Sequence, residues 1–340
     1  MVKSYREAGV DIEKESETID AIVRELNYRR EGLGGLIDIG RHFTGLVDFG
    51  EYALSLCTDG VGTKLLVAEA MKKWDTLGID CVALNVNDMI CVGAEPLAFV
   101  DYFALSRYDE EVARQIAIGL NRGAEMANIT IVGGELSTIP EIVRHFDLAG
   151  TCLGYVRKDS IITGSDIRPG DSIIGFRSSG VHSNGLTLAR KVFESSNVSY
   201  EDFLPQSRQT VGEALLEPMS IYVLPVLEAL KNFNVKGMAH ITGGGYRNIA
   251  RMNPGVEYRI EEPFEPHPIF RSIQSLGEIE DREMYQTFNM GLGFVAVVPE
   301  EDADSVLGFL REKAEVKLIG SVVEGKGVSI PGMNLHYEEY

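Results

Sequence analysis

The segment Cys57-Thr58-Asp59-Gly60-Val61-Gly62-Thr63-Lys64 links a short extended run, residues 52–56, to an amphipathic pattern over residues 65–73 that predicts a helix. A strand that passes through glycines into a helix leaves backbone N–H groups free to bind an anion. Asp59 supplies the hard carboxylate oxygen that Mg²⁺ takes when it is shared with phosphate, and Lys64 supplies a compact positive charge. The segment therefore predicts a site for a metal–nucleotide phosphate.

The same segment matches neither of two common nucleotide-binding motifs. A Walker A loop needs four residues between its first glycine and the Gly-Lys pair, and the run from Gly60 to Lys64 is too short. The Gly-x-Gly-x-x-Gly pattern needs a third glycine where Leu65 stands. A glycine-rich turn that binds no ligand is the alternative, so the phosphate hypothesis needs support from other segments.

Length and composition limit the class of protein. A chain of 340 residues suits two α/β domains, which we place at residues 1–164 and 165–340. The net charge of −19 argues against nucleic acid or an anionic membrane as the main partner. No apolar run has the length of a membrane span, and the first residues lack a signal peptide, so we expect a cytoplasmic protein. The four cysteines show no Cys-x-x-Cys spacing and are interpreted as buried, reduced thiols.

A helical pattern over residues 78–92 carries a second candidate metal ligand. Its apolar residues recur at helical spacing, and Asn85 and Asp88 lie together on the otherwise apolar helix. A buried carboxylate needs a charged partner or a metal, so we favour Asp88 as a metal ligand. The alternative is an exposed Asp88, or one that caps a neighbouring segment.

Three later segments repeat the order of strand, then glycines, then a polar group. Residues 129–132 lead to Gly133-Gly134-Glu135, residues 172–176 lead to the loop 178–185, and residues 238–241 lead to Thr242-Gly243-Gly244-Gly245. Alternating strands and helices predict an α/β fold. Near the N-terminus we expect a helix over residues 17–30 capped by Ser16. The glycine-rich stretch 32–45 is either a lid over the phosphates or a plain surface loop.

Taken together and in order, these motifs resemble one family, the AIR synthetases (phosphoribosylformylglycinamidine cyclo-ligases), over nearly the whole chain. The runs that carry the resemblance are Ala8-Gly9-Val10-Asp11-Ile12, Thr58 to Lys64, Gly78-Ile79-Asp80, Asn87-Asp88, Gly93-Ala94-Glu95-Pro96-Leu97, Asp101-Tyr102, Val132-Gly133-Gly134-Glu135, Ser178-Ser179-Gly180, His182-Ser183-Asn184-Gly185, His240 to Gly245 and Thr287-Phe288-Asn289. The resemblance implies a two-domain fold, a homodimer whose N-terminal sheets complete a barrel across the interface, and an ATP site between the domains.

The resemblance also implies a reaction and roles for residues. In this family ATP phosphorylates the formyl oxygen of formylglycinamidine ribonucleotide, and an amidine nitrogen then closes the imidazole ring. We expect Asp59, Asp88 and Glu135 to hold Mg²⁺ on the ATP phosphates, with Lys64 and the backbone of Gly60 and Gly62 offsetting further charge. The other expected ATP and substrate contacts are Thr63, Asn87, Ser183, Asn184 and the Thr242-Gly243-Gly244-Gly245 cradle for a ribose phosphate.

Two histidines leave alternatives open. His182, in a Gly-Val-His-Ser-Asn-Gly loop, is the candidate general acid–base or phosphate contact. Its alternative is a histidine that fixes its own loop by backbone hydrogen bonds. For His240, at the end of a predicted strand, we favour a structural role.

Departures from the family pattern bear on contacts rather than on the reaction. The family's second acid after Gly-Gly-Glu is absent from Leu136-Ser137-Thr138, and Met219-Ser220 stands where the family has an arginine. Rival superfamily members are disfavoured, because no cysteine precedes Cys57 and none lies at the C-terminus. Thr58-Asp59-Gly60 also stands where a thiamin-monophosphate kinase would show Gly-Asp-Asp. A catalytically silent nucleotide-binding protein is the rival from another class.

Overall fold

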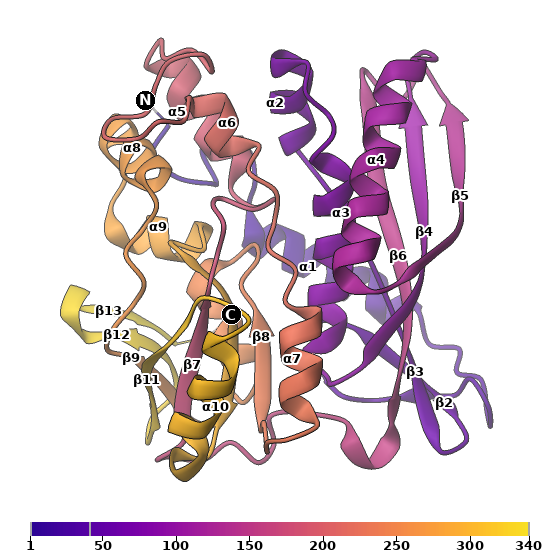
Figure 1. The fold of residues 1–340 in the computed structure, drawn as a ribbon, viewed down its shortest axis with the longest axis vertical. Coiled ribbons are helices and arrows are strands. Elements are labelled where there is room, and N and C mark those ends of the chain that lie inside the picture. The colour runs from indigo at the N-terminus through magenta and orange to yellow at the C-terminus, as the bar shows by residue number, and fades with distance from the viewer. Residues whose placement is uncertain (1, 41, 339–340) are drawn as a thin grey trace.

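The computed structural model describes residues 2–40 and 42–338 and divides into two lobes, each built on one β-sheet (Figure 1). The first lobe contains the six-stranded sheet. Its strands, in spatial order, are β1 (Leu36–Ile37), β2 (Gly45–Phe49), β3 (Tyr52–Gly60), β6 (Phe146–Arg157), β4 (Glu95–Leu105) and β5 (Thr130–Thr138). All neighbouring strands are antiparallel except β4 and β5, which are parallel.

Helices α3 (Leu77–Ile90) and α4 (Glu110–Ala127) lie on one face of this sheet, and the short helix α2 (Lys64–Met71) follows β3 (Figure 1). α3 and α4 pack closely because glycines face each other. A Cβ atom at Gly78 would lie 2.1 Å from the backbone nitrogen of Leu120, and one at Gly119 would lie 2.6 Å from the backbone oxygen of Asp75. No larger residue fits at these two positions without moving a helix.

The second lobe contains a seven-stranded sheet that is antiparallel except where β9 meets β12. In spatial order its strands are β13 (Leu335–Tyr337), β12 (Gly327–Ile330), β9 (Glu257–Ile260), β11 (Val316–Val323), β7 (Ser172–Arg177), β10 (Leu292–Val298) and β8 (Gly237–His240). Its helices are α5 (Leu186–Ser195), α6 (Val211–Leu215), α7 (Val223–Leu230), α8 (Pro268–Gly277), α9 (Asp281–Thr287) and α10 (Ala303–Arg311). Short 3₁₀ turns η1 (Lys158–Ser160), η2 (Gly245–Arg251), η3 (Glu300–Asp302) and η4 (Pro331–Met333) complete the described elements.

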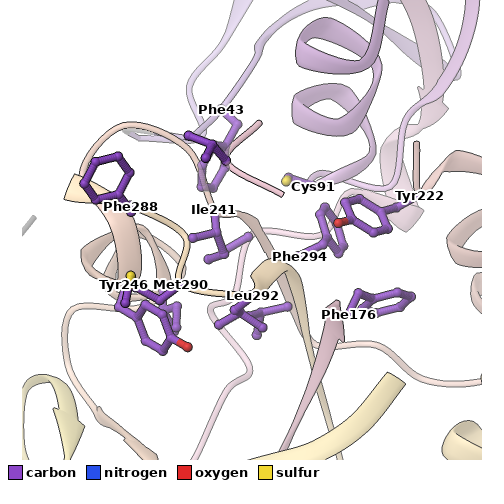
Figure 2. Close-up of a cluster of buried hydrophobic side chains, with 14 of the residues drawn as sticks. Phe43, Cys91, Phe176, Tyr222, Ile241, Tyr246, Phe288, Met290, Leu292 and Phe294 are labelled. Atoms are coloured by element: carbon purple, nitrogen blue, oxygen red, sulfur yellow. The ribbon is translucent and has the colours of Figure 1, made fainter. Parts of the chain in front are cut away.

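A buried aromatic cluster of the second lobe lies near the place where α7 packs beside α3 of the first lobe (Figure 1). Phe176, Tyr222 and Phe294 pack at ring-centroid distances of 5.5–5.7 Å. Figure 2 shows this group on the same side of the cluster as Cys91, which follows the end of α3. Because apolar surface from both lobes is removed from water here, the cluster stabilises their relative position.

Three predicted elements differ from the structure. The first helix, α1, runs Ile12–Glu25 rather than 17–30, because the Asp11 side chain, not Ser16, accepts the capping bond from the Lys14 amide. Gly133-Gly134-Glu135 lies inside β5, not at a turn into a helix, because the strand continues to Thr138 and leads to β6. The order of strand and then glycines also predicts a helix from Tyr246, but residues Gly245–Arg251 form the 3₁₀ turn η2.

The thiol environment agrees with the prediction for three of the four cysteines. All four are unpaired; Cys81, Cys91 and Cys152 are buried, whereas Cys57 is partly exposed.

Within residues 2–40 and 42–338, no helix combines the length and apolar character that a membrane crossing requires.

Candidate active site

A carboxylate pair lies at the junction of the lobes. Asp59 is the next-to-last residue of β3, and Asp88 lies in the last turn of α3, both in the first lobe. His240, the last residue of β8 in the second lobe, contacts Asp88 through a 2.7 Å bond between Nδ1 and Oδ1. A carboxylate only accepts hydrogen bonds, so Nδ1 donates. His240 is fully buried, and its Nε2 has no partner among the described residues.

The negative charge of Asp88 acts on Asp59. Burial, and after it the negative charge of Asp88, raises the pKa of Asp59 to about 6 from the ordinary 3.8. The side chain of Asp88 is 17% exposed, so one part of it remains accessible while His240 holds the other. Two neighbouring carboxylates in a partly desolvated position repel each other unless a proton or a cation lies between them. This donor set fits Mg²⁺, which binds one or two carboxylates and completes its shell with water and phosphate oxygens.

Glu135 lies far from this pair within one chain. The strand register aligns Asp59 with Gly150, Gly150 with Asp101, and Asp101 with Gly134. Three strand spacings of about 4.8 Å place Gly134 roughly 14 Å from Asp59. Glu135, the next residue, points to the opposite face of the sheet and is exposed. Among the residues that the structure describes, no cluster of three or more Asp, Glu, His or Cys side chains could hold a metal.

Lys64 has a partner other than phosphate. Its Nζ lies 2.8 Å from Asp80 Oδ2 and donates to the Glu217 backbone oxygen at 2.6 Å, and both charged side chains are completely buried. Asp80 also accepts from the Met219 amide at 2.8 Å. The pair therefore ties α2 and α3 to residues 217–219 of the second lobe.

His182 is likewise buried, at 1% exposure, and its Nε2 accepts a 3.3 Å bond from the Ser179 amide. The pKa of His182 lies well below its usual value, first because burial disfavours the charged form and then because His240 lies nearby. A neutral, enclosed imidazole bonded to its own loop matches the structural alternative for this residue. Its φ of 62° shows that the loop turns sharply at this position.

The polar loops of the second lobe do meet the first glycine segment. The hydroxyl of Thr63 lies 3.0 Å from that of Thr187, at the start of α5. Asn184 is adjacent to the 242–245 turn, since a Cβ on Gly243 would lie 3.2 Å from the Asn184 Oδ1 atom. The structure therefore brings the segments containing Gly60, Gly62 and Thr63, Ser183 and Asn184, and Thr242 to Gly245 to one junction.

Asn87 is not free to bind a ligand at this junction. Its side chain is buried, donates to the Ser220 backbone oxygen at 2.8 Å and accepts from the Tyr222 amide at 2.9 Å. Together with Lys64 and Asp80 it fastens residues 217–222 to the first lobe.

Two family models match most of the chain. The model described as "AIR synthase related protein, N-terminal domain" matches residues 43–156, and "AIR synthase related protein, C-terminal domain" matches residues 168–332. The chain belongs to the AIR synthase-related family. The family accounts for both the β3–α2 junction and the glycine-rich loops of the second lobe, since these lie inside the matched ranges.

Individual relatives support the same family. A protein of Methanosarcina acetivorans named phosphoribosylformylglycinamidine cyclo-ligase is 50% identical over 323 residues, which is 94% of this chain and 95% of the relative. The solved structure of "AaThiL complexed with AMPPCP and TMP" has a TM-score of 0.64 at 18% identity and covers 94% of this chain and 93% of its own. "Hydrogenase Maturation Protein HypE in complex with ATP" has a TM-score of 0.58 at 18% identity, with coverages of 80% and 77%. The two structures establish the shared fold.

Sequence reasoning missed two features of the junction. The contact of His240 with Asp88 joins residues 152 positions apart, and no local pattern signals it. Asp101 is half-buried, and burial raises its pKa. It lies two strands from Asp59 across the sheet, because both residues are aligned with Gly150 of β6. Because strand residues two apart share a face, its spacing from the apolar residues Phe99 and Phe103 could have placed Asp101 on the helix-covered face.

Proposed function

We propose that this protein is an ATP-dependent cyclo-ligase of purine biosynthesis that converts formylglycinamidine ribonucleotide to aminoimidazole ribonucleotide, ADP and phosphate. The relative that is 50% identical along almost the whole chain supports the substrate and the ligase class. One structural observation supports the reaction type: two carboxylates, Asp59 and Asp88, lie together where three polar loops from both lobes converge. A structural neighbour with the same fold holds ATP, which supports ATP as the co-substrate.

The residues at the junction have different roles in the proposed phosphoryl transfer. Mg²⁺, when bound, neutralises phosphate charge, and Asp59 with Asp88 would hold it. His240 donates to Asp88 and so fixes which carboxylate oxygen stays free. The backbone amides of Gly62 and of Lys64, the first residue of α2, are the proposed phosphate contacts, since the amides of Leu65 and Leu66 already donate to the carbonyl oxygens of Gly62 and Thr63. Residues 183–184 and 242–245 are the proposed contacts of the ribonucleotide.

In this proposal three residues that the sequence suggested as phosphate, substrate or acid–base contacts have a positioning role instead: Lys64, Asn87 and His182. Each is buried and bonded to backbone of the second lobe, so each positions the polar loops without touching phosphate. The chemistry then depends on orientation and on charge neutralisation, which carry most of a phosphoryl transfer.

We also propose a homodimer formed through the face of the first sheet that carries no helix. Leu56, Val100 and Tyr102 point to that face and are 46%, 39% and 41% exposed. Exposed apolar side chains grouped on one sheet face are typical of an interface. Glu135 lies on this face too, so a second copy would place it near the neighbouring chain.

The cytoplasm remains the expected location of the protein.

Product formation tests the function. Purified protein is incubated with Mg-ATP and formylglycinamidine ribonucleotide, and ADP and aminoimidazole ribonucleotide are quantified. The proposal predicts equal amounts of both products and no ADP with thiamin monophosphate. ADP formed with thiamin monophosphate alone would assign the protein to the kinase branch of the fold, and nucleotide binding without any turnover would assign it to the silent class.

A further inference from the structure

A separate cavity lies in the second lobe, formed by segments that carry none of Asp59, Asp88 or His240. Its volume is about 790 Å³, and its walls are the end of β7, α5, the loop 198–206, the start of α6 and α8 with the residues before it. Pockets that bind small molecules span about 300–1,000 Å³ and combine apolar walls with a few convergent polar groups. The size of this cavity lies within that range.

The floor of the cavity is apolar and fixed. Phe193, Leu204 and Val211 line it and are only 1%, 3% and 2% exposed, so they belong equally to the core of the lobe. Backbone hydrogen bonds brace the loop above them: the Leu204 amide donates to Gln209 at 3.0 Å, and the Val211 amide donates to Asp202 at 2.9 Å. The cavity is therefore preformed, and a ligand would lose little affinity to loop ordering.

One aromatic side chain is left in water at the cavity. Phe203 lines the cavity, yet it is 70% exposed, although its strand-like bridge to Thr210 fixes its backbone. A large aromatic ring held in place beside a cavity gains free energy when a second apolar or aromatic surface covers it. The ring therefore favours a ligand with an aromatic portion.

Two arginines of the wall favour an anionic group on that ligand. Arg177 pairs with Glu315 at 3.4 Å, and Arg271 pairs with Glu265. The side chains of Arg271 and Glu265 are 59% and 73% exposed, and such a solvent-exposed ion pair contributes at most about 1 kcal/mol. Arg177 is only 21% exposed and also donates to the Glu265 backbone oxygen at 3.1 Å, so its guanidinium is held in place beside the cavity. An incoming anion can therefore replace Glu265 on Arg271 at small cost, and guanidinium groups bind carboxylate, sulfonate or phosphate oxygens in a forked geometry.

His267 adds a polar wall of fixed orientation. Its Nε2 donates to the Ser178 backbone oxygen at 2.7 Å, and burial lowers the pKa of its ring below the usual value. A neutral imidazole that donates from Nε2 carries a lone pair on Nδ1. An N–H group on the ligand could donate to this lone pair. It is therefore the third chemical feature, after the aromatic portion and the anionic group, that the cavity favours in a ligand.

From these contacts we propose that the cavity bounded by Phe203, Arg177, Arg271 and His267 is a binding site for a small aromatic anion, distinct from the cyclo-ligase site. The aromatic portion packs on Phe203 and the apolar floor, and the anionic group pairs with the arginines. Because the floor is preformed, the site binds without a change of fold.

The probe for this site is 8-anilinonaphthalene-1-sulfonate, an aromatic monoanion whose fluorescence rises on binding. A titration of the full-length protein should saturate, whereas the neutral N-phenyl-1-naphthylamine should bind more weakly. Arg271→Gln should weaken binding of the sulfonate by about three- to fivefold. Ser275→Trp, at an exposed position of α8 that lines the cavity, should abolish the signal by filling the cavity.

Matched controls lie on α10, outside the cavity. Ser305→Trp and Arg311→Gln make the same changes at exposed helix positions and should leave the titration unchanged. Far-UV circular dichroism and Tm of all four variants establish that they fold. The proposal is overturned if the wild-type protein does not bind the sulfonate. It is also overturned if Ser275→Trp and Arg271→Gln bind it as the wild type does, or if the neutral analogue binds equally well.

Discussion

His240 and Asp88 form a 2.7 Å hydrogen bond across the two lobes, with Nδ1 of the buried imidazole donating to a carboxylate that is 17% exposed. This contact links the end of β8, the edge strand of the second lobe's sheet, to the last turn of α3 in the first lobe. The aromatic cluster behind it includes Phe294, whose ring centroid lies 6.5 Å from that of His240. The orientation of one carboxylate at the candidate metal site therefore depends on the packing of both lobes.

The first prediction concerns this hydrogen bond. His240→Leu removes the donor, and we expect the affinity for Mg²⁺ or Mn²⁺ to fall by about 10–100-fold, as when a residue that orients a metal ligand is lost. His240→Asn keeps an amide N–H near the position of Nδ1 and should retain most of the affinity. His240→Gln displaces the donor and should resemble His240→Leu. Titration calorimetry in the presence of a non-hydrolysable ATP analogue measures the metal affinity of all three variants. Equal affinities of the His240→Leu and His240→Asn variants would refute the role of His240 in orienting Asp88.

The second prediction concerns Lys64 and Asp80. Lys64→Met leaves the Asp80 carboxylate buried without its partner, and we expect a loss of about 3–5 kcal/mol in the free energy of unfolding by urea. The double variant Lys64→Met/Asp80→Leu removes both charges and should recover part of that loss. A Lys64→Met protein with wild-type stability but weakened ATP binding would return Lys64 to a phosphate-binding role.

The third prediction concerns pH. Since the folded-state pKa of Asp59 is raised to about 6, the folded protein binds more protons than the unfolded chain between pH 4 and 6. The contribution of Asp59 to stability is thus largest at low pH and is lost as pH rises through this window. Asp59→Asn should stabilise the metal-free protein by about 1–2 kcal/mol at pH 7 and have no such effect at pH 4. Thermal unfolding in a chelating buffer at both pH values gives the comparison, and an equal effect at both would contradict the assignment.

The fourth prediction concerns oligomeric state. Val100→Glu places a charge in the middle of the exposed face of the first sheet, and we expect it to convert a dimer to a monomer. Leu318→Glu, at a 43% exposed position of β11 in the other sheet, is the matched control and should leave the dimer intact. Sedimentation equilibrium distinguishes the two states. A wild-type monomer, or a dimer of the Val100→Glu variant, would exclude this interface.

Much of the fold could be predicted from local patterns. The helix predicted over residues 78–92 carries strong apolar periodicity, and the structure has it at Leu77–Ile90, within two residues of the predicted bounds. The first helix was misplaced because Asp11 and Ser16 are both good caps, and only the tertiary structure selects between them. The Gly133-Gly134-Glu135 run was misassigned because glycines usually interrupt a strand, whereas here Gly134 leaves room for Asp101, whose Oδ1 would lie 2.4 Å from a Cβ at that position.

The candidate site was less predictable than the fold. Sequence identified the residue types at the junction, because glycines and acids at a strand end have a local signature. It assigned Lys64 to phosphate because the charge of a lysine is visible in the sequence, but its burial against Asp80 is not. The separation of Glu135 from Asp59 depends on strand order, with β6 and β4 between β3 and β5. Strand order is a property of the whole sheet and has no counterpart in a short motif.

The fate of the formyl oxygen tests the central claim most directly. Formylglycinamidine ribonucleotide labelled with ¹⁸O in the formyl group is turned over with Mg-ATP, and the released phosphate is analysed by mass spectrometry. If ATP phosphorylates that oxygen before ring closure, each aminoimidazole ribonucleotide formed is accompanied by one ADP and one ¹⁸O-containing phosphate. Label recovered in water with unlabelled phosphate, or no ring closure at all, would contradict the proposed reaction.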